Sequence, residues 1–299
     1  VSRLELLTSA GDEATRVTVD RDGERRVEPA ARGRGTTVTV EDLLYNRTPR
    51  REALGTERTE FGRIAGVVTD YALCRPRVAL SMTARNLEPG PCANVVAELR
   101  GRELPEEIVL IAGHLDAWDT GSGAHDDGAG CTIMVAALDV LRDLDLRPRR
   151  TLRVVLYTSE EYGGHGGRVY AEAHADEIDR HVLALESDAG CFAPAGFSVM
   201  ADSAAIAALT AYAADLARVG ADSVYAGWAG VDIRPLVDRG VPGVGHRRHG
   251  ADYFRYHHGP ADVYEAVSPQ DLAANVAAVA GFAYAVANSP DPIPRPKDD

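Results

Sequence analysis

The chain has 299 residues, of which 45% are hydrophobic, and this composition excludes a disordered chain and allows a sizeable buried core. Its formal net charge is −13, and the acidic surplus lies in residues 81–299, which contain 32 acidic and 18 basic residues. This negative charge argues against nucleic acids and anionic membranes as partners.

The first part of the chain predicts short strands followed by one helix. The strands are expected at LELL, ATRVTVD, ERRVEPA and TTVTV, with a turn at Arg-Asp-Gly-Glu between the second and the third. A helix is expected at residues 58–73, because apolar residues recur there at the spacing of one helix face. Pro76 ends this helical segment.

From about residue 77 onward, strands and helices alternate. Strands are expected at VALSMTA, ANVVAELRG, EIVLIAG, TLRVVLYT, HVLALES and VPGVG, and helices at about residues 128–144, 202–218 and 269–288. This alternation predicts crossover connections, and hence an α/β fold with a mostly parallel central sheet. No window of about 18 apolar residues occurs, so no membrane-spanning helix is expected.

The cysteines and the first residues give little information about metal sites, disulfides or the location of the protein. The four cysteines form no CxxC pair, so the sequence predicts neither a thiolate zinc site nor a dense disulfide framework. The start VSRLELL lacks the basic and apolar segments of a signal peptide, and the location of the protein, secreted or cytoplasmic, is left open.

Ionisable side chains follow the predicted parallel strands. In open α/β sheets, ligands bind beyond the carboxyl ends of the strands. The side chains expected at that edge are His114, Asp116, Asp126, Asp127, Glu160, Glu161, Asp188, His257 and His258. Carboxylates gathered there without lysines would repel each other and raise their own pKa values unless cations neutralised them. Imidazole and carboxylate ligands without thiolate favour Zn²⁺, with Co²⁺ or Mn²⁺ as possible substitutes.

Each of these motifs also has an ordinary structural explanation. The run GHLDAWDTGSGAHDDGAG, residues 113–130, is compatible with a solvated loop, because Gly and Asp are common turn residues. The acidic pair after TLRVVLYT is compatible with the start of a solvated helix. The occurrence of all the ligand types in order at successive strand ends favours the metal site.

Residues 77–289 resemble the di-zinc aminopeptidase family, and within it the carboxypeptidase Q-like members. The resemblance lies in AGHLDAWD, GAHDDGAG, RPRRTLRVVLYTSEEYGGHG, ALESDAG, GVDIRPLVDRGVPG and YFRYHHGPAD. It implies a three-layer sandwich of the zinc exopeptidase type, with a cis peptide bond after Asp126. It also implies the ligands of two zinc ions: His114 and Asp188 for one ion, Glu161 and His258 for the other, and Asp126 as the bridge between them.

The resemblance further implies the residues that surround the ligands. Glu160 matches the general base, and Asp116 is expected to orient the imidazole of His114. Asp262 is expected to do the same for His258, and it lies with Asp232 and His246 among the residues expected near the substrate. The choice of His258 over His257 rests on its four-residue spacing to Asp262. Trp118 and Tyr162 are expected either to line the pocket or to pack in the core.

The function that the resemblance implies is a metal-dependent exopeptidase. It would hydrolyse short peptides or dipeptides with a free N-terminus through a bridging water activated by two zinc ions per chain, and a homodimer is also implied. A glutaminyl-cyclase-like acyl transfer on the same scaffold and a binding-only protein are the alternatives. The presence of all five ligand types favours hydrolysis.

Residues 1–76 carry a second, unrelated resemblance. The run GRGTTVTVEDLLYNRTPRREALGTERTEFGRIAGVVTDYAL resembles MutL, the mismatch-repair ATPase family. The Asp-x-Gly-x-Gly loop and the glycine-rich lid with which that family binds ATP do not occur in it. We therefore expect a partial α+β segment without ATPase activity over residues 1–76, and a catalytic domain over residues 77–299. A mismatch-repair-related module or an inactive chimera is the remaining alternative.

Overall fold

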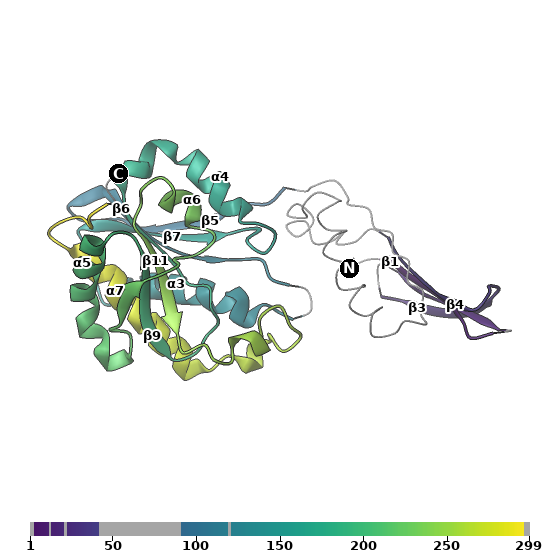
Figure 1. Cartoon of the computed structure of the whole chain (residues 1–299). Helices are drawn as coiled ribbons and strands as arrows, with labels where there is room; N and C mark the ends of the chain where they lie inside the picture. The colour runs from purple at the N-terminus through teal and green to yellow at the C-terminus, as the bar shows by residue number, and fades with distance from the viewer. Residues whose placement is uncertain (1–2, 12, 21–22, 42–90, 119–120, 296–299) are drawn as a thin grey trace. The chain divides into compact units, whose positions relative to one another are not determined.

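The structure is a computed structural model that describes residues 3–11, 13–20, 23–41, 91–118 and 121–295. The chain divides into two compact units, Val1–Cys92 and Ala93–Asp299. Figure 1 shows the elements of both units. The helix expected at residues 58–73 and the strand expected at VALSMTA lie outside the described residues, so the domain boundary expected after residue 76 stays a prediction.

The described part of the first unit is an antiparallel sheet. Its strands are β1 (Arg3–Ser9), β2 (Ala14–Val19), β3 (Arg25–Ala30) and β4 (Gly35–Glu41), in the order β3-β2-β1-β4. The four expected strands are therefore confirmed. The register pairs Leu6 with both Val17 and Val38, and Leu4 with Val19 and Val40, so alternation along the strands gathers these aliphatic side chains on one face of this sheet.

The second unit contains a larger, mostly parallel sheet. Its described strands are β5 (Val95–Leu99), β6 (Leu104–His114), β7 (Arg150–Tyr157), β8 (His181–Glu186), β9 (Pro194–Met200), β10 (Val224–Ala226) and β11 (Gly243–Arg248). They lie in the order β10-β9-β11-β8-β6-β7-β5, with antiparallel pairing only of β5 with β7 and of β9 with β11 within the described residues. The expected mostly parallel sheet is confirmed.

Helices cover both faces of this sheet (Figure 1). On one face, α3 (Ala129–Asp143), α5 (Ser203–Ala213) and α7 (Pro269–Asn288) pack over a core that includes Ile133, Leu209 and Phe282. On the other face, α4 (His165–Ala173) and α6 (Arg234–Val237) pack over a core that includes Tyr170 and Leu236. Two apolar clusters separated by a sheet make the three-layer α/β sandwich that the sequence analysis expects.

Short irregular turns complete the second unit. They are η1 (Ala124–Gly128), η2 (Ala175–Arg180), η3 (Ala214–Val219), η4 (Tyr253–Arg255) and η5 (Tyr264–Ala266). The helix expected at residues 202–218 is divided into α5 and the 3₁₀ turn η3. Among the described residues, no helix has both the length and the apolar character needed to cross a membrane.

Candidate metal centre

The register of the sheet brings the carboxyl ends of three neighbouring strands to one edge. In β6, Ala112 pairs with Val155 of β7 on one side and with Glu186 of β8 on the other. His114 is the last residue of β6, and the loops after β7 and β8 carry Glu161 and Asp188. Three ionisable side chains from distant parts of the sequence therefore meet at this edge.

The first group of metal-binding atoms consists of His114, Asp126 and Asp188. His114 Nε2 lies 3.2 Å from Asp126 Oδ1 and 3.6 Å from Asp188 Oδ1. One nitrogen or oxygen atom from each residue lies within 4.8 Å of the others, a spacing that could hold one cation.

The second group shares Asp126 with the first. Asp126 Oδ2 lies 3.4 Å from His258 Nε2 and 3.8 Å from His257 Nε2, and His258 Nε2 lies 2.8 Å from Glu161 Oε2. The structure thus brings together all five residues that the sequence analysis predicts as ligands. Their roles as ligands stay a prediction, and the proximity of His257 leaves it as a competitor of His258.

The donor atoms fit divalent cations. Four of them are buried without a hydrogen-bond partner among the described residues: His114 Nε2, Asp126 Oδ2, Glu161 Oε1 and Asp188 Oδ1. Unpaired buried polar atoms are costly, and coordination of a cation removes that cost. Because the donors are imidazole nitrogens and carboxylate oxygens, they suit zinc.

The electrostatics of the centre also favour bound cations. Burial, together with the neighbouring carboxylates, raises the pKa of Glu160 to about 7 and that of Glu161 to about 9. Burial alone would lower the pKa of His114, but Asp126 and Asp188 outweigh it and raise that pKa well above its ordinary value. A cation beside these groups would favour their ionised, metal-binding forms.

Buried carboxylates next to the ligands hold the backbone of the ligand-bearing loops. Asp116 Oδ1 and Oδ2 accept hydrogen bonds from the backbone N–H groups of Glu160 and Glu161, at 3.0 and 3.2 Å. The imidazole of His114 is instead held through its Nδ1, which lies 2.9 Å from the backbone oxygen of Asp116. The expected orienting role of Asp116 is thus carried by its carbonyl oxygen, because its carboxylate serves the neighbouring loop.

Asp127 plays a similar part on the other side of His114. Its Oδ2 accepts a hydrogen bond from the backbone N–H of His114 at 3.1 Å, and its Oδ1 accepts one from Gly130 at 3.1 Å. The peptide bond between Asp126 and Asp127 is cis, in agreement with the resemblance. The sequence predicts no role for Asp127, because neither of its backbone partners has a sequence signature.

Residues 94–283, more than half of the chain, match the sequence model of Peptidase family M28. The chain belongs to this family. Membership supports a metal-dependent peptidase, and it confirms the resemblance found for the larger part of the sequence.

Individual relatives agree with this family assignment. Carboxypeptidase Q of Rattus norvegicus is 38% identical over 218 residues, which are 73% of this chain and 46% of the relative. The solved structure of a peptidase M28 precursor from Shewanella amazonensis is 40% identical, with a TM-score of 0.65, over 69% of this chain and 47% of that chain. A zinc aminopeptidase from Bacillus subtilis shares the fold, with a TM-score of 0.53 at 20% identity over 63% of this chain and 49% of that chain. The chain spans about half the length of the curated relatives it matches.

The chain is also similar to a protein outside the peptidase family. The DNA mismatch repair protein MutL of Halobacterium salinarum is 37% identical over 109 residues, which are 34% of this chain and 16% of that protein. The partial resemblance to MutL is therefore confirmed. Because so little of MutL is covered, the match carries no statement about activity.

Two residues expected near the substrate lie in the interior of the second unit, Ala93–Asp299, which is called the M28 unit from here on. His246 is 1% exposed and stacks on Phe197, with ring centroids 5.6 Å apart. It lies inside β11, which continues three residues beyond the expected strand VPGVG. His246 is thus buried within a strand, and contact between it and a substrate stays a prediction, as for Asp232.

Asp232 is also buried, with no exposed surface. Neither of its carboxylate oxygens has a hydrogen-bond partner among the described residues, and burial together with Glu186 raises its pKa well above the ordinary value. Glu186 accepts hydrogen bonds from the backbone N–H groups of Val231 and Ile233, which flank Asp232. Contact between Asp232 and a substrate amine stays a prediction. The burial of Asp232 argues against it.

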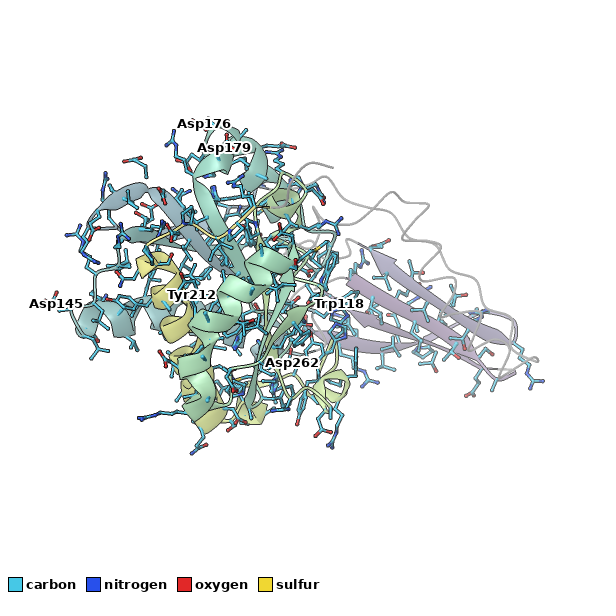
Figure 2. All side chains as sticks on the ribbon, turned by 60° about the vertical axis from the view of Figure 1, so that its left-hand side comes forward. Trp118, Asp145, Asp176, Asp179, Tyr212 and Asp262 are labelled. Carbon is cyan, nitrogen blue, oxygen red and sulfur yellow. The ribbon has the colours of Figure 1, made fainter. Side chains whose placement is uncertain are left out.

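Aromatic side chains border the second group of donors. The Trp118 ring lies 4.9 Å from that of His258 and 5.8 Å from that of Tyr162, measured between centroids. Figure 2 shows Trp118 and Asp262 at one end of the M28 unit and Asp145, just beyond α3, at the other end. The ring of Trp118 therefore borders the second group of metal-binding atoms.

Proposed function

We propose that the chain is a metal-dependent exopeptidase that holds two zinc ions and hydrolyses short peptides or dipeptides with a free N-terminus. The observation that carries the proposal is the shared position of Asp126. One of its oxygens faces His114 and the other faces His258, and each side adds a further carboxylate. A carboxylate between two groups of donors would suit a pair of cations, one held by each group.

When bound, two such cations would lower the pKa of a water between them and polarise the scissile carbonyl. Glu160 supplies the proton transfers. Its carboxylate, next in the chain to the candidate ligand Glu161, accepts a proton from the attacking water and returns it to the leaving amine. Asp116 holds the backbone of Glu160, so that its neighbour Glu161 binds a cation while Glu160 stays free for this work.

The acidic centre also supports a substrate with a free amino group. Carboxylates near the centre that do not bind a cation would attract an ammonium group. The names of the relatives, carboxypeptidase Q and zinc aminopeptidase, indicate exopeptidases that differ in their substrates. We therefore propose a short peptide as the partner of the site, without nucleic acid or membrane, and a homodimer as the assembly.

The test combines metal analysis with hydrolysis by the full chain. We expect about two zinc ions per chain and cleavage of an unblocked dipeptide that stops when a chelator is added. An N-acetylated copy of the same dipeptide should resist cleavage, because it lacks the ammonium group. Glu160→Gln should lower the rate by about 10²- to 10⁴-fold, the usual worth of a general base, and keep its zinc.

Two results would contradict the proposal. A folded chain that binds no zinc would remove the metal centre. Cleavage that survives in Glu160→Gln at an unchanged rate would assign the proton transfer to another residue.

A further inference from the structure

Asp262 holds the loop that carries the shared carboxylate Asp126. Its Oδ1 accepts a hydrogen bond from the backbone N–H of His125 at 2.5 Å, and its Oδ2 accepts one from the backbone N–H of Asp126 at 3.2 Å. The residue is only 3% exposed, so both bonds are formed out of water. Hydrogen bonds from backbone N–H groups to an ionised acceptor are among the stronger ones in proteins.

The contact extends beyond the carboxylate. The backbone N–H and the hydroxyl of Ser122 both donate to the carbonyl oxygen of Asp262, at 2.7 and 3.2 Å. A Cβ atom on Gly121 would lie 2.6 Å from the carbonyl oxygen of Gly259 and 2.7 Å from that of Asp262. Residues 121–126 and 259–262 are thus two loops in direct contact, with no room for a side chain between them.

This contact joins two candidate ligands that are far apart in the sequence. Asp126 lies in the first loop, and His258 immediately precedes the second. The distance of 3.4 Å between Asp126 Oδ2 and His258 Nε2 therefore depends on how closely the two loops are held. A small shift of either loop would move Asp126 away from one group of donors.

We propose that Asp262 is a positioning residue for the shared carboxylate: it locks the Asp126 loop onto the histidine loop so that both cation positions can use Asp126. The proposal rests on the proposed metal centre. It differs from the role expected from the sequence, in which Asp262 acts on the imidazole of His258 or on the substrate. Its action through the backbone gives it no direct part in the chemistry.

The loop has a second anchor, which allows the proposal to be tested in a folded chain. The ring of His125 stacks on the rings of both Phe192 and Tyr256, with centroids 5.0 and 4.5 Å away. Its Nδ1 accepts a hydrogen bond from the backbone N–H of Cys191 at 2.9 Å. Loss of the Asp262 bonds should therefore loosen Asp126 without releasing the whole loop.

The experiment measures zinc affinity in the full chain carrying Asp262→Asn. An asparagine turns its NH₂ group toward one of the two backbone donors, so one hydrogen bond is lost and two donors face each other. We expect zinc affinity, measured by competition with a chelator, to fall by about 10- to 100-fold, as for other residues that hold metal ligands. The visible absorption of the Co²⁺-loaded chain should change as well, because the ligand geometry changes.

Two control variants separate the loss of zinc affinity at Asp262 from the general effects of losing a carboxylate or a surface charge. Asp202→Asn removes a carboxylate that also accepts a backbone N–H, from Ala205 at the start of α5, away from the centre. Asp252→Asn removes an exposed charge that pairs with Arg255, a few residues before His257 and His258. Both should keep the zinc affinity and the Co²⁺ spectrum of the unchanged chain.

Two results would overturn the positioning role of Asp262. An Asp262→Asn chain that melts lower without zinc but binds zinc as tightly as the Asp202→Asn chain would overturn the proposal. If the variant does not fold, Gly121→Ala, which pushes the same two loops apart, must weaken zinc binding, and unchanged binding there would overturn it. An unchanged chain that binds no zinc would instead contradict the proposed function.

Discussion

At the scale of single residues, buried carboxylates near the metal centre have two distinct uses. Those predicted as ligands keep oxygen atoms without a hydrogen-bond partner among the described residues, as Asp126, Glu161 and Asp188 do. Others accept two backbone N–H bonds each: Asp116, Asp127, Glu186 and Asp262. The second set orders the loops before any cation arrives, which reduces the entropy lost on binding.

The two adjacent histidines provide the first prediction. His258 Nε2 lies close to both Asp126 and Glu161, whereas the ion pair that His257 Nε2 forms within the described residues is with Asp126, at 3.8 Å. His258→Asn should therefore lose one of the two zinc ions, and His257→Asn should keep both. Elemental analysis of the two purified variants is the measurement, with each variant as the control of the other. The reverse pattern would transfer the ligand role to His257.

The candidate ligands could be predicted from the sequence because their positions depend on strand ends. His114, Glu161 and Asp188 each follow an apolar run that is long enough to recognise. The partners of Asp262 could not be predicted, since a backbone N–H group is present at every residue except proline. The burial of His246 could not be predicted either, because β11 extends to Arg248, beyond the apolar residues that mark the strand in the sequence.

At the scale of elements, the glycines of the run 113–130 make room for Asp127. A Cβ atom on Gly113 would lie 2.6 Å from Asp127 Oδ2 and 2.9 Å from the amide nitrogen of Cys131. A Cβ atom on Gly130 would collide with the same carboxylate and with the carbonyl oxygen of Ser187. The end of β6 and the start of α3 are therefore as close as the backbone permits, with Asp127 between them.

This packing predicts the effect of a single methyl group. Gly113→Ala should lower the free energy of unfolding by about 1–3 kcal/mol, the usual cost of overpacking a core, and should weaken zinc binding because His114 is the next residue. The comparison is Gly250→Ala, whose Cβ would have no neighbour closer than 3.8 Å. Urea unfolding of both zinc-free variants measures the effect. Equal stability of the two would mean that β6 and α3 can separate without cost.

The elements that the sequence analysis missed are those with a weak hydrophobic pattern. β10 contains three residues, too few to show alternation, and β9 begins with proline and contains Gly196. The residues of β9 become a strand because β11 and β10 pair with them on either side. Such pairing is a property of the whole sheet, and local propensity does not reveal it.

At the scale of the whole molecule, a partly buried polar network joins several elements of the second unit. Arg153 of β7 donates to Glu98 of β5 at 2.6 Å, and to Tyr170 of α4 and Glu177 of η2 at 2.8 Å each. The hydroxyl of Tyr170 lies 3.1 Å from Nε2 of His181 in β8. Burial, with the charge of Arg153, lowers the pKa of His181 to about 4.

The depressed pKa predicts a pH-dependent stability. The unfolded chain protonates His181 near its ordinary pKa of 6.5, whereas the folded chain resists protonation until about pH 4. The unfolded state therefore binds more protons in this window, and stability falls as the pH falls, by at most about 1.4 kcal/mol per pH unit from this one group. His181→Gln should show a smaller fall between about pH 7 and pH 5, in urea unfolding with a chelator present. Equal slopes for both chains would assign the effect to other groups.

The last prediction concerns where the catalytic unit begins. The division of the structure lies between Cys92 and Ala93, whereas the sequence predicts a boundary after residue 76, with a strand at VALSMTA. In the described sheet, β5 is an edge strand, and its Val95 and Val96 are 51% and 46% exposed. An exposed apolar edge invites pairing with other chains unless a further strand covers it.

Two truncated chains separate these boundaries. A chain of residues 77–299 and a chain of residues 93–299 both contain every candidate ligand, so both should bind the same amount of zinc. The longer one should melt at a higher temperature and stay free of aggregates in size-exclusion chromatography, because the predicted strand at VALSMTA can pair with the edge of β5. If the two chains melt alike and the shorter one stays free of aggregates, residues 77–92 contribute nothing to the sheet, and the catalytic unit begins at Ala93.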